Sequence, residues 1–200
     1  MAHHDQDRRC LLVIDVEATC DEGGRMPRRE MEVIEIGAVL VDDATLQTLA
    51  EFQSFVRPRR NPSLTPFCTH LTKITQSHVD AAPTFAEAIE ALRRFLDGRR
   101  PTFCSWGDYD REQLADDAAF AGVRLPFSLT EHVNLKARFA EALGETKKRG
   151  TQGALTRVGL VFQGVQHRGI DDARNIARLL PWALGRVAPV ANAKGGVGCP

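Results

Sequence analysis

The sequence predicts an α/β fold in which helices flank a mixed β-sheet. Two observations predict it: three apolar, strand-like segments follow one another near the start, and helical and strand-like segments alternate after residue 84. The length of 200 residues, 43% of them hydrophobic and 26% charged, suits one globular domain. We expect this domain to span residues 10–186, after a polar N-terminal extension (1–9) and before a disordered, glycine-rich tail (187–200).

The first three strands are expected at residues 10–18, 33–41 and 50–56. Each is a run of apolar residues of strand length, and the second and third are separated by a short segment that begins with two aspartates. Consecutive strands joined in this way favour an antiparallel meander. The sheet is therefore expected to begin with antiparallel pairing.

The chain after the third strand changes character twice. Three prolines, Pro58, Pro62 and Pro66, predict an irregular segment, because proline cannot donate a backbone hydrogen bond. Thr84 and Glu87 then have the spacing of a capping box, which predicts a helix that ends at Gly98. Further segments predict a strand at 101–106 and helices at 110–121, 130–143, 151–158 and 170–184.

Charge and cysteine content exclude several classes of protein. The 26 basic residues balance the 26 acidic ones, so affinity for a polyanion must come from local patches, for which the basic runs 57–60 and 147–149 are candidates. Five cysteines without a CxxC pair favour reduced thiols over a disulfide framework or a zinc ribbon. No apolar run approaches the roughly 20 residues of a membrane-spanning helix, and the N-terminus lacks a signal-peptide core. We expect a cytoplasmic protein without membrane contact.

Two acidic residues interrupt the first apolar strand. Asp15 and Glu17 lie two positions apart, and the two-residue period of a strand directs both carboxylates to the same face. Like charges beside a hydrophobic core are costly unless a cation neutralises them. A divalent metal with oxygen ligands is the candidate, and a surface or hydrogen-bonded position is the alternative.

Two further motifs combine polar residues at the ends of predicted elements. His167 lies in a loop that leads into a helix, where Asp171 is the expected N-cap and Asp172 falls in the first turn. Alone, such a histidine is more often simply exposed to solvent. The segment 106–111 (WGDYDR) follows the fourth strand, at the edge where open α/β sheets bind ligands.

Together these motifs resemble those of the DEDDh 3′-to-5′ exonucleases in the ribonuclease-H-like superfamily. The family has DxE on its first strand, Asp at the start of the helix after the fourth strand, and His five residues before a final Asp. The matching positions are Asp15, Glu17, Asp110, His167 and Asp172. The resemblance spans residues 10–184, and HLTKIT and SWGDYDREQL are more similar to histone-mRNA-type RNA 3′-end exonucleases and their bacterial relatives than to proofreading subunits. It implies a five-stranded mixed sheet whose first three strands are antiparallel.

The resemblance also implies a hydrolase with two Mg²⁺ ions, which Mn²⁺ can replace. Asp15 would bridge both ions, Glu17 and Asp172 would hold the ion near the nucleophile, and Asp110 would support the second. His167 would act as the general base, because an imidazole titrates near neutral pH. Asp108 competes with Asp110 for the third carboxylate position.

The implied substrate is the 3′ end of a single-stranded nucleic acid, with RNA favoured over DNA and nucleoside 5′-monophosphates as products. Ala18 and Thr19 would contact the terminal nucleotide, and Leu71, expected in the loop before the first helix, would pack on a base. Trp106 is a candidate for base stacking, with a core position as the alternative. Two other functions stay open: a DNA repair or proofreading exonuclease, and a non-catalytic nucleic-acid-binding module.

Overall fold

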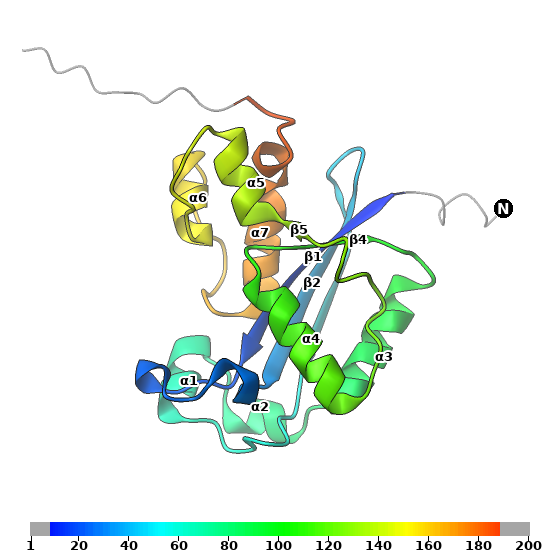
Figure 1. The fold of residues 1–200 in the computed structure, drawn as a ribbon, viewed down its shortest axis with the longest axis vertical. Coiled ribbons are helices and arrows are strands. Elements are labelled where there is room, and N and C mark those ends of the chain that lie inside the picture. The colour runs from blue at the N-terminus through cyan, green and yellow to red at the C-terminus, as the bar shows by residue number, and fades with distance from the viewer. Residues whose placement is uncertain (1–8, 189–200) are drawn as a thin grey trace, which may run out of the picture.

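The computed structural model describes residues 9–188, so the predicted extension and tail lie almost entirely outside the described residues. Five strands form one sheet in the order β3-β2-β1-β4-β5 (Figure 1). The strands are β1 (Cys10–Ala18), β2 (Val33–Asp42), β3 (Thr48–Phe55), β4 (Thr102–Ser105) and β5 (Val133–Asn134). β1, β2 and β3 pair antiparallel, while β4 and β5 run parallel to β1. The predicted α/β fold with a mixed sheet is confirmed.

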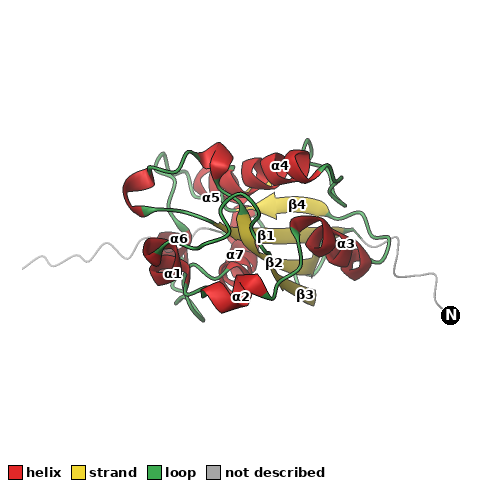
Figure 2. Cartoon of the chain, turned by 90° about the horizontal axis from the view of Figure 1, so that it is seen from below, coloured by secondary structure: helices red, strands yellow, loops and turns green. Residues whose placement is uncertain are grey.

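Helices cover both faces of the sheet (Figures 1 and 2). They are α1 (Pro66–Thr72), α2 (Gln76–Asp80), α3 (Phe85–Leu96), α4 (Tyr109–Ala121), α5 (Leu135–Ala142), α6 (Thr151–Arg157) and α7 (Gly169–Ala183), with short 3₁₀ turns at Glu22–Gly24 and Arg28–Glu30. Alternate residues of β1 divide between two cores. Leu12 and Ile14 pack with α3 and α4, whereas Leu11 and Val13 pack with α5, α6 and α7. No helix within residues 9–188 is both long and apolar enough to span a bilayer.

Two predicted segments were wrong in secondary structure. The proline-containing segment is not wholly irregular, because α1 begins at Pro66, where the missing N–H would have no helical partner in any case. Thr65 caps that helix by accepting a hydrogen bond from the N–H of Cys68. The predicted helix 130–143 begins only at Leu135, since residues 133–134 pair with β4 and Asn134 caps α5.

One predicted helix cap is confirmed and another is wrong. Thr84 and Glu87 form the predicted capping box of α3. Asp171 is not the N-cap of α7, because Arg168 occupies that position and no side chain caps the helix. The carboxylate of Asp171 instead accepts a hydrogen bond from the N–H of Val165, at 2.9 Å, and so orders the preceding loop.

Two glycines bring α7 onto the sheet. A Cβ atom on Gly37 of β2 would lie 2.1 Å from the carbonyl carbon of Gly169, the first residue of α7. A Cβ atom on Gly169 would lie 2.9 Å from the carbonyl oxygen of Asp15. Only residues without side chains allow this close approach. The first turn of α7 therefore rests directly against β1 and β2.

Candidate active site

Three carboxylates from β1 and α7 converge at one end of the sheet. Asp15 and Glu17 lie on the face of β1 that α7 covers, as their two-residue spacing predicts. Each of Asp15, Glu17 and Asp172 contributes a carboxylate oxygen to a group whose atoms all lie within 4.8 Å of one another. Asp172 lies more than 150 positions after Asp15 and Glu17 in the sequence. The close contact between Gly37 and Gly169 brings these residues together.

The segment before α7 places His167 beside this group. The residue has a left-handed backbone conformation, with φ of 60°, and its side chain is exposed to solvent. Its backbone N–H donates to Oδ2 of Asp172 at 2.8 Å. The backbone of His167 is thus joined to one of the three clustered carboxylates by a short hydrogen bond.

A fourth carboxylate comes from the second residue of α4. Asp110 is buried, and its Oδ1 accepts a hydrogen bond at 3.0 Å from the N–H of Val16, the residue between Asp15 and Glu17. Asp108 points elsewhere: its half-exposed carboxylate accepts from the Asn134 amide at 2.8 Å and lies 3.4 Å from the Arg111 guanidinium. The structure brings Asp110, and not Asp108, to the acidic cluster.

The four carboxylates perturb one another strongly in the absence of a cation. Burial and then the charge of Asp110 raise the pKa of Asp15 well above its usual value. Burial and then the charge of Asp172 raise the pKa of Glu17 to about 9. Burial raises the pKa of Asp110 and of Asp172 to about 6, against hydrogen bonds from Val16 and His167 respectively. Folding therefore holds negative charges together at a cost that a bound cation would offset.

The donor set fits a hard divalent cation. All four side chains offer carboxylate oxygens, the ligands that Mg²⁺ and Mn²⁺ prefer. Within residues 9–188, no lysine or arginine forms an ion pair with any of the four. The alternative of a surface or hydrogen-bonded DxE pair does not describe Asp15 and Glu17, which are partly buried and whose side chains form no hydrogen bond within the described residues.

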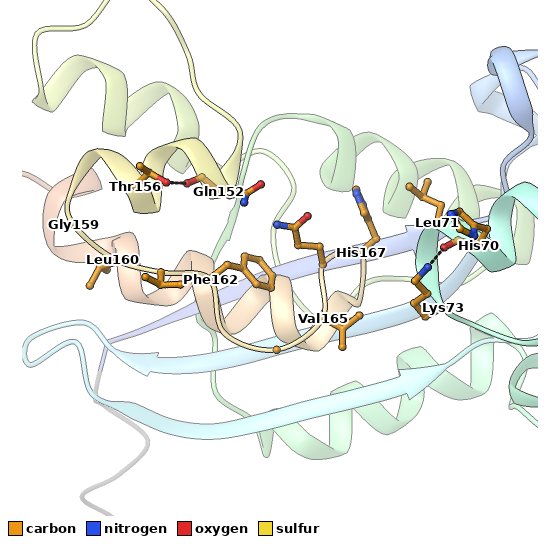
Figure 3. Close-up of a pocket in the computed structure, with 13 residues that line it drawn as sticks. His70, Leu71, Lys73, Gln152, Thr156, Gly159, Leu160, Phe162, Val165 and His167 are labelled. Carbon is orange, nitrogen blue, oxygen red and sulfur yellow. Dashed lines mark hydrogen bonds between the residues drawn. The ribbon is translucent and has the colours of Figure 1, made fainter.

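An open groove of about 890 Å³ lies beside His167 (Figure 3). Its walls come from the C-terminal part of α1, from α6 and from the loop 159–167, and Leu71 and His167 both line it. A smaller hollow of about 370 Å³ continues from His167 to Asp172. Leu71 lies within α1 and not in the loop where it was expected, because the helix extends to Thr72. Its contact with a base stays a prediction.

The other predicted substrate contacts have protein partners. Ala18 is buried, and the hydroxyl of Thr19 accepts from the N–H of Glu32 at 2.9 Å, so that this side chain serves the fold. Trp106 packs edge-on against Phe139, and its indole N–H donates to the carbonyl of Arg149. Packing already explains the position of Trp106, and its role in stacking stays a prediction.

Sequence reasoning missed one acid at this site. Glu35 of β2 is completely buried and lies opposite Glu17 in the strand register. Its carboxylate is held by Arg168, whose Nε lies 3.0 Å from Oε2. The available signal was a glutamate within the apolar run VIEIGAVLV, a residue that is rarely buried unless it is paired.

The fold and the site together give an acidic cluster that could hold a divalent metal ion, and comparison with known proteins gives the family. The model of the RNase_T family, described as "Exonuclease", matches residues 12–180. The chain is 32% identical to the 3′-5′ exonuclease eri1 of Schizosaccharomyces pombe over 86% of its own length and 67% of the relative's. It is 33% identical to the 3′-5′ exonuclease Snipper of Drosophila melanogaster, over 85% and 67% respectively. It is 31% identical to ERI1 exoribonuclease 3 of Bos taurus, over 90% of its own length and 55% of the relative's.

Solved structures agree with the sequence relatives. The nuclease domain of 3′hExo, a DEDDh family member bound to rAMP, superposes with a TM-score of 0.79 and 28% identity, over 91% of this chain and 92% of that one. A 3′-exonuclease that recognises the histone mRNA stem-loop superposes with a TM-score of 0.82 and 28% identity, over 91% of this chain and 65% of that one. The chain therefore belongs to the RNase T-type DEDDh 3′-5′ exonuclease family, among the relatives of eri1 and 3′hExo. It spans between 28% and 67% of the length of the curated relatives that it matches.

Proposed function

We propose that this protein is a metal-dependent 3′-to-5′ exonuclease that removes nucleoside 5′-monophosphates from single-stranded RNA. The observation that carries the proposal is the group of carboxylate oxygens from Asp15, Glu17 and Asp172 within 4.8 Å, beside an exposed His167. Family membership and the direction of cleavage in its relatives support it. Cytoplasmic localisation stays a prediction from the sequence.

Asp15, Glu17, Asp110 and Asp172 would hold two Mg²⁺ ions, or Mn²⁺ in their place. Two such ions stabilise the negative charge on the attacking and leaving oxygens of a phosphodiester and lower the pKa of a water molecule. Asp15 is the candidate for the shared ligand, because the charges of both Asp110 and Asp172 raise its pKa. The asymmetric burial of the four side chains, with Asp110 most enclosed, leaves the open side of the cluster to the substrate.

His167 would take the proton from the attacking water. Its imidazole is exposed and borders the hollow that reaches Asp172, so it can contact a solvent molecule at the cluster. The hydrogen bond from its N–H to Asp172 restricts where its backbone can move. Histidine is the side chain that most often serves as a general base.

RNA is the favoured substrate because the named relatives include exoribonucleases and an enzyme specific for a histone mRNA stem-loop. The groove beside His167 is open, so it can admit a strand end, and Lys73 and His70 lie on its wall. Single-stranded DNA is the second candidate, since structural neighbours of lower identity, such as exonuclease I of E. coli with DNA bound, share the fold.

Matched oligonucleotides test the proposal. The purified protein with Mg²⁺ or Mn²⁺ should shorten 5′-labelled linear RNA from its 3′ end in single-nucleotide steps, and a chelator should stop the reaction. Circular RNA of the same sequence should survive. Faster loss of the matched DNA would make DNA the substrate, and nicking of circles at the same rate as linear strands would contradict exonuclease action.

A chromogenic ester of thymidine 5′-monophosphate separates catalysis from binding. With Mn²⁺, an exonuclease of this type should hydrolyse the ester, and the Asp15→Asn variant should not. A non-catalytic nucleic-acid-binding module would leave the ester intact while still binding RNA.

A further inference from the structure

Glu35 is a buried acid at the candidate active site that the proposed chemistry does not use. It lies opposite Glu17 in the antiparallel register of β1 and β2, and none of its surface is exposed. A carboxylate in such a position is strongly destabilising unless hydrogen bonds and a cation satisfy it. The partners of Glu35 therefore indicate what it does.

Both oxygens of Glu35 are fully engaged by the protein. Oε2 accepts from Nε of Arg168 at 3.0 Å and from the N–H of Gly169 at 3.1 Å. Oε1 accepts from the Gln53 amide at 2.6 Å and from Nη2 of Arg168 at 3.3 Å. The guanidinium also lies over the ring of Phe55, 5.2 Å from its centre. With four donors on two oxygens, Glu35 is an anchor for Arg168 and not a ligand for a cation.

Arg168 lies between His167, in the loop before α7, and Asp172, in the first turn of that helix. The proposed chemistry needs both of these residues. Arg168 is the N-cap of α7, it follows His167, and its carbonyl accepts from the N–H of Asp172 at 2.9 Å. The two-pronged contact with Glu35 fixes this residue to β2. Only a guanidinium can make such a paired contact, because the ammonium of lysine is a point charge.

His167 and Asp172 depend on the contact between Arg168 and Glu35 to different degrees. Asp172 belongs to a helix of 15 residues, and Ile170 and Ala173 beside it are buried in the core. His167 lies outside the helix in a left-handed conformation, which costs about 1 kcal/mol for a residue with a side chain. The orientation of His167 therefore depends on Arg168 much more than that of Asp172 does.

We propose that Arg168 and Glu35 are positioning residues, which hold the imidazole of His167 in place for proton transfer. The positive charge of Arg168 also balances the negative charge of Glu35. This inference rests on the proposed function. Neither side chain is proposed to touch the substrate.

A double-mutant cycle with His167 tests the proposal on the chromogenic thymidine ester with Mn²⁺. Arg168→Lys should lower kcat about tenfold or more with KM changed by less than about twofold, because misplaced catalytic groups cost rate more than binding. In a His167→Ala background the same substitution should cost less than about twofold, because the group that it positions is absent. Calorimetric titration should show Mn²⁺ affinity within about threefold of the wild type, and the pH-rate inflection of the base should shift or disappear.

Arg174→Lys is the matched control, since Arg174 lies on α7 and its guanidinium is likewise paired with carboxylates, in this case those of Glu51 and Asp171. It should leave kcat within about twofold of the wild type. Glu35→Gln provides a second test of the pair if Arg168→Lys does not fold, and it should show the same dependence on His167. Equal losses of rate in the two backgrounds, or no loss, would overturn the positioning role. An inactive wild-type protein would instead contradict the proposed function.

Discussion

Two groups of acidic side chains, each buried or partly buried, have different surroundings. Glu32 and Asp117 lie where α4 meets the start of β2, and almost every oxygen has a donor. Glu32 accepts from the N–H groups of residues 59, 60 and 61 at 2.7–2.8 Å, and Asp117 accepts from Val33 and Gln113. The guanidinium of Arg60 lies within 3.8 Å of both carboxylates.

The group at the end of β1 has fewer such partners, and no arginine pairs with it within residues 9–188. Asp15 and Glu17 form no hydrogen bond or ion pair through their side chains within residues 9–188, and Asp110 and Asp172 each accept chiefly from backbone N–H groups. The difference teaches that burial alone does not identify a metal site. Buried acids with a full set of protein donors stabilise the fold, whereas clustered carboxylates without such donors are candidates for binding a cation.

The comparison also corrects one expectation about basic residues. Arg60 belongs to a basic run that was a candidate for phosphate contacts, but its guanidinium donates to the carbonyls of Arg29 and Met31 and lies over Phe120. Its charge is used within the protein. Arg60 is therefore a poor candidate for binding a nucleic acid backbone.

The largest expected effect separates the two acidic groups directly. Asp15→Asn should lower Mn²⁺ affinity and turnover together by orders of magnitude, because it removes the candidate shared ligand. Glu32→Gln should reduce thermal stability and leave turnover per folded molecule within about threefold, since it removes one charge from a network that shares no side chain with the cluster. Calorimetry and ester hydrolysis on both variants measure this. Equal losses of metal affinity would abolish the distinction.

Within the candidate site, Asp110 and Asp108 should differ strongly. Asp110→Asn should lower turnover at least about a hundredfold, because Asp110 is buried beside β1 and coupled to Asp15. Asp108→Asn should be milder, since its carboxylate contacts Asn134 at the surface. Steady-state rates with matched protein concentrations test this, and the reverse ranking would show that Asp108 is the ligand.

His167→Ala should affect proton transfer without removing a carboxylate. Turnover should fall about a hundredfold, the contribution expected of a general base, while divalent-ion affinity stays near the wild-type value. The remaining activity should rise with pH as hydroxide replaces the base. Metal titration beside pH-rate profiles measures both, and a loss of affinity as large as that of Asp15→Asn would make His167 a ligand or a scaffold residue.

Much of this site was predictable from local pattern, and part of it was not. The two-residue period placed Asp15 and Glu17 on one face, and the position of Asp110 near the start of α4 followed from the strand-to-helix sequence. The meeting of Asp172 with β1 depends on the contact between Gly37 and Gly169, which no local period reveals. Resemblance to a family supplied that pairing.

The sequence did not predict helix α1 or the role of Glu35, for different physical reasons. The helix α1 was hidden because three prolines indicated irregular structure, although proline at the first helical position costs nothing. The role of Glu35 was hidden because its partners come from β3 and the start of α7, over 130 positions away in the second case. Long-range partners of this kind determine which buried acids are structural.

The smallest expected effect concerns stability without metal. In the folded protein the pKa of Glu17 is about 9, against an ordinary value of 4.5. Between these values the folded state retains a proton that the unfolded chain has lost, so the protein should lose stability as pH rises through this range. Thermal unfolding in a chelator from about pH 5 to about pH 9 should show this, and Glu17→Gln should raise Tm at the alkaline end by about 2–4 °C. A Tm that is independent of pH, or lower in the variant, would contradict the assigned pKa.

Crystals equilibrated with Mn²⁺ test the central claim most directly, because anomalous scattering locates the ion without reference to activity. We predict anomalous density among the carboxylates of Asp15, Glu17 and Asp172, with Asp110 beside it, and none between Glu32 and Asp117. The latter pair serves as the internal control, since it is acidic and buried but supplied with protein donors. Density at Glu32 and Asp117, or an ion-free cluster at Mn²⁺ concentrations that support hydrolysis, would contradict the distinction between the two groups of acids.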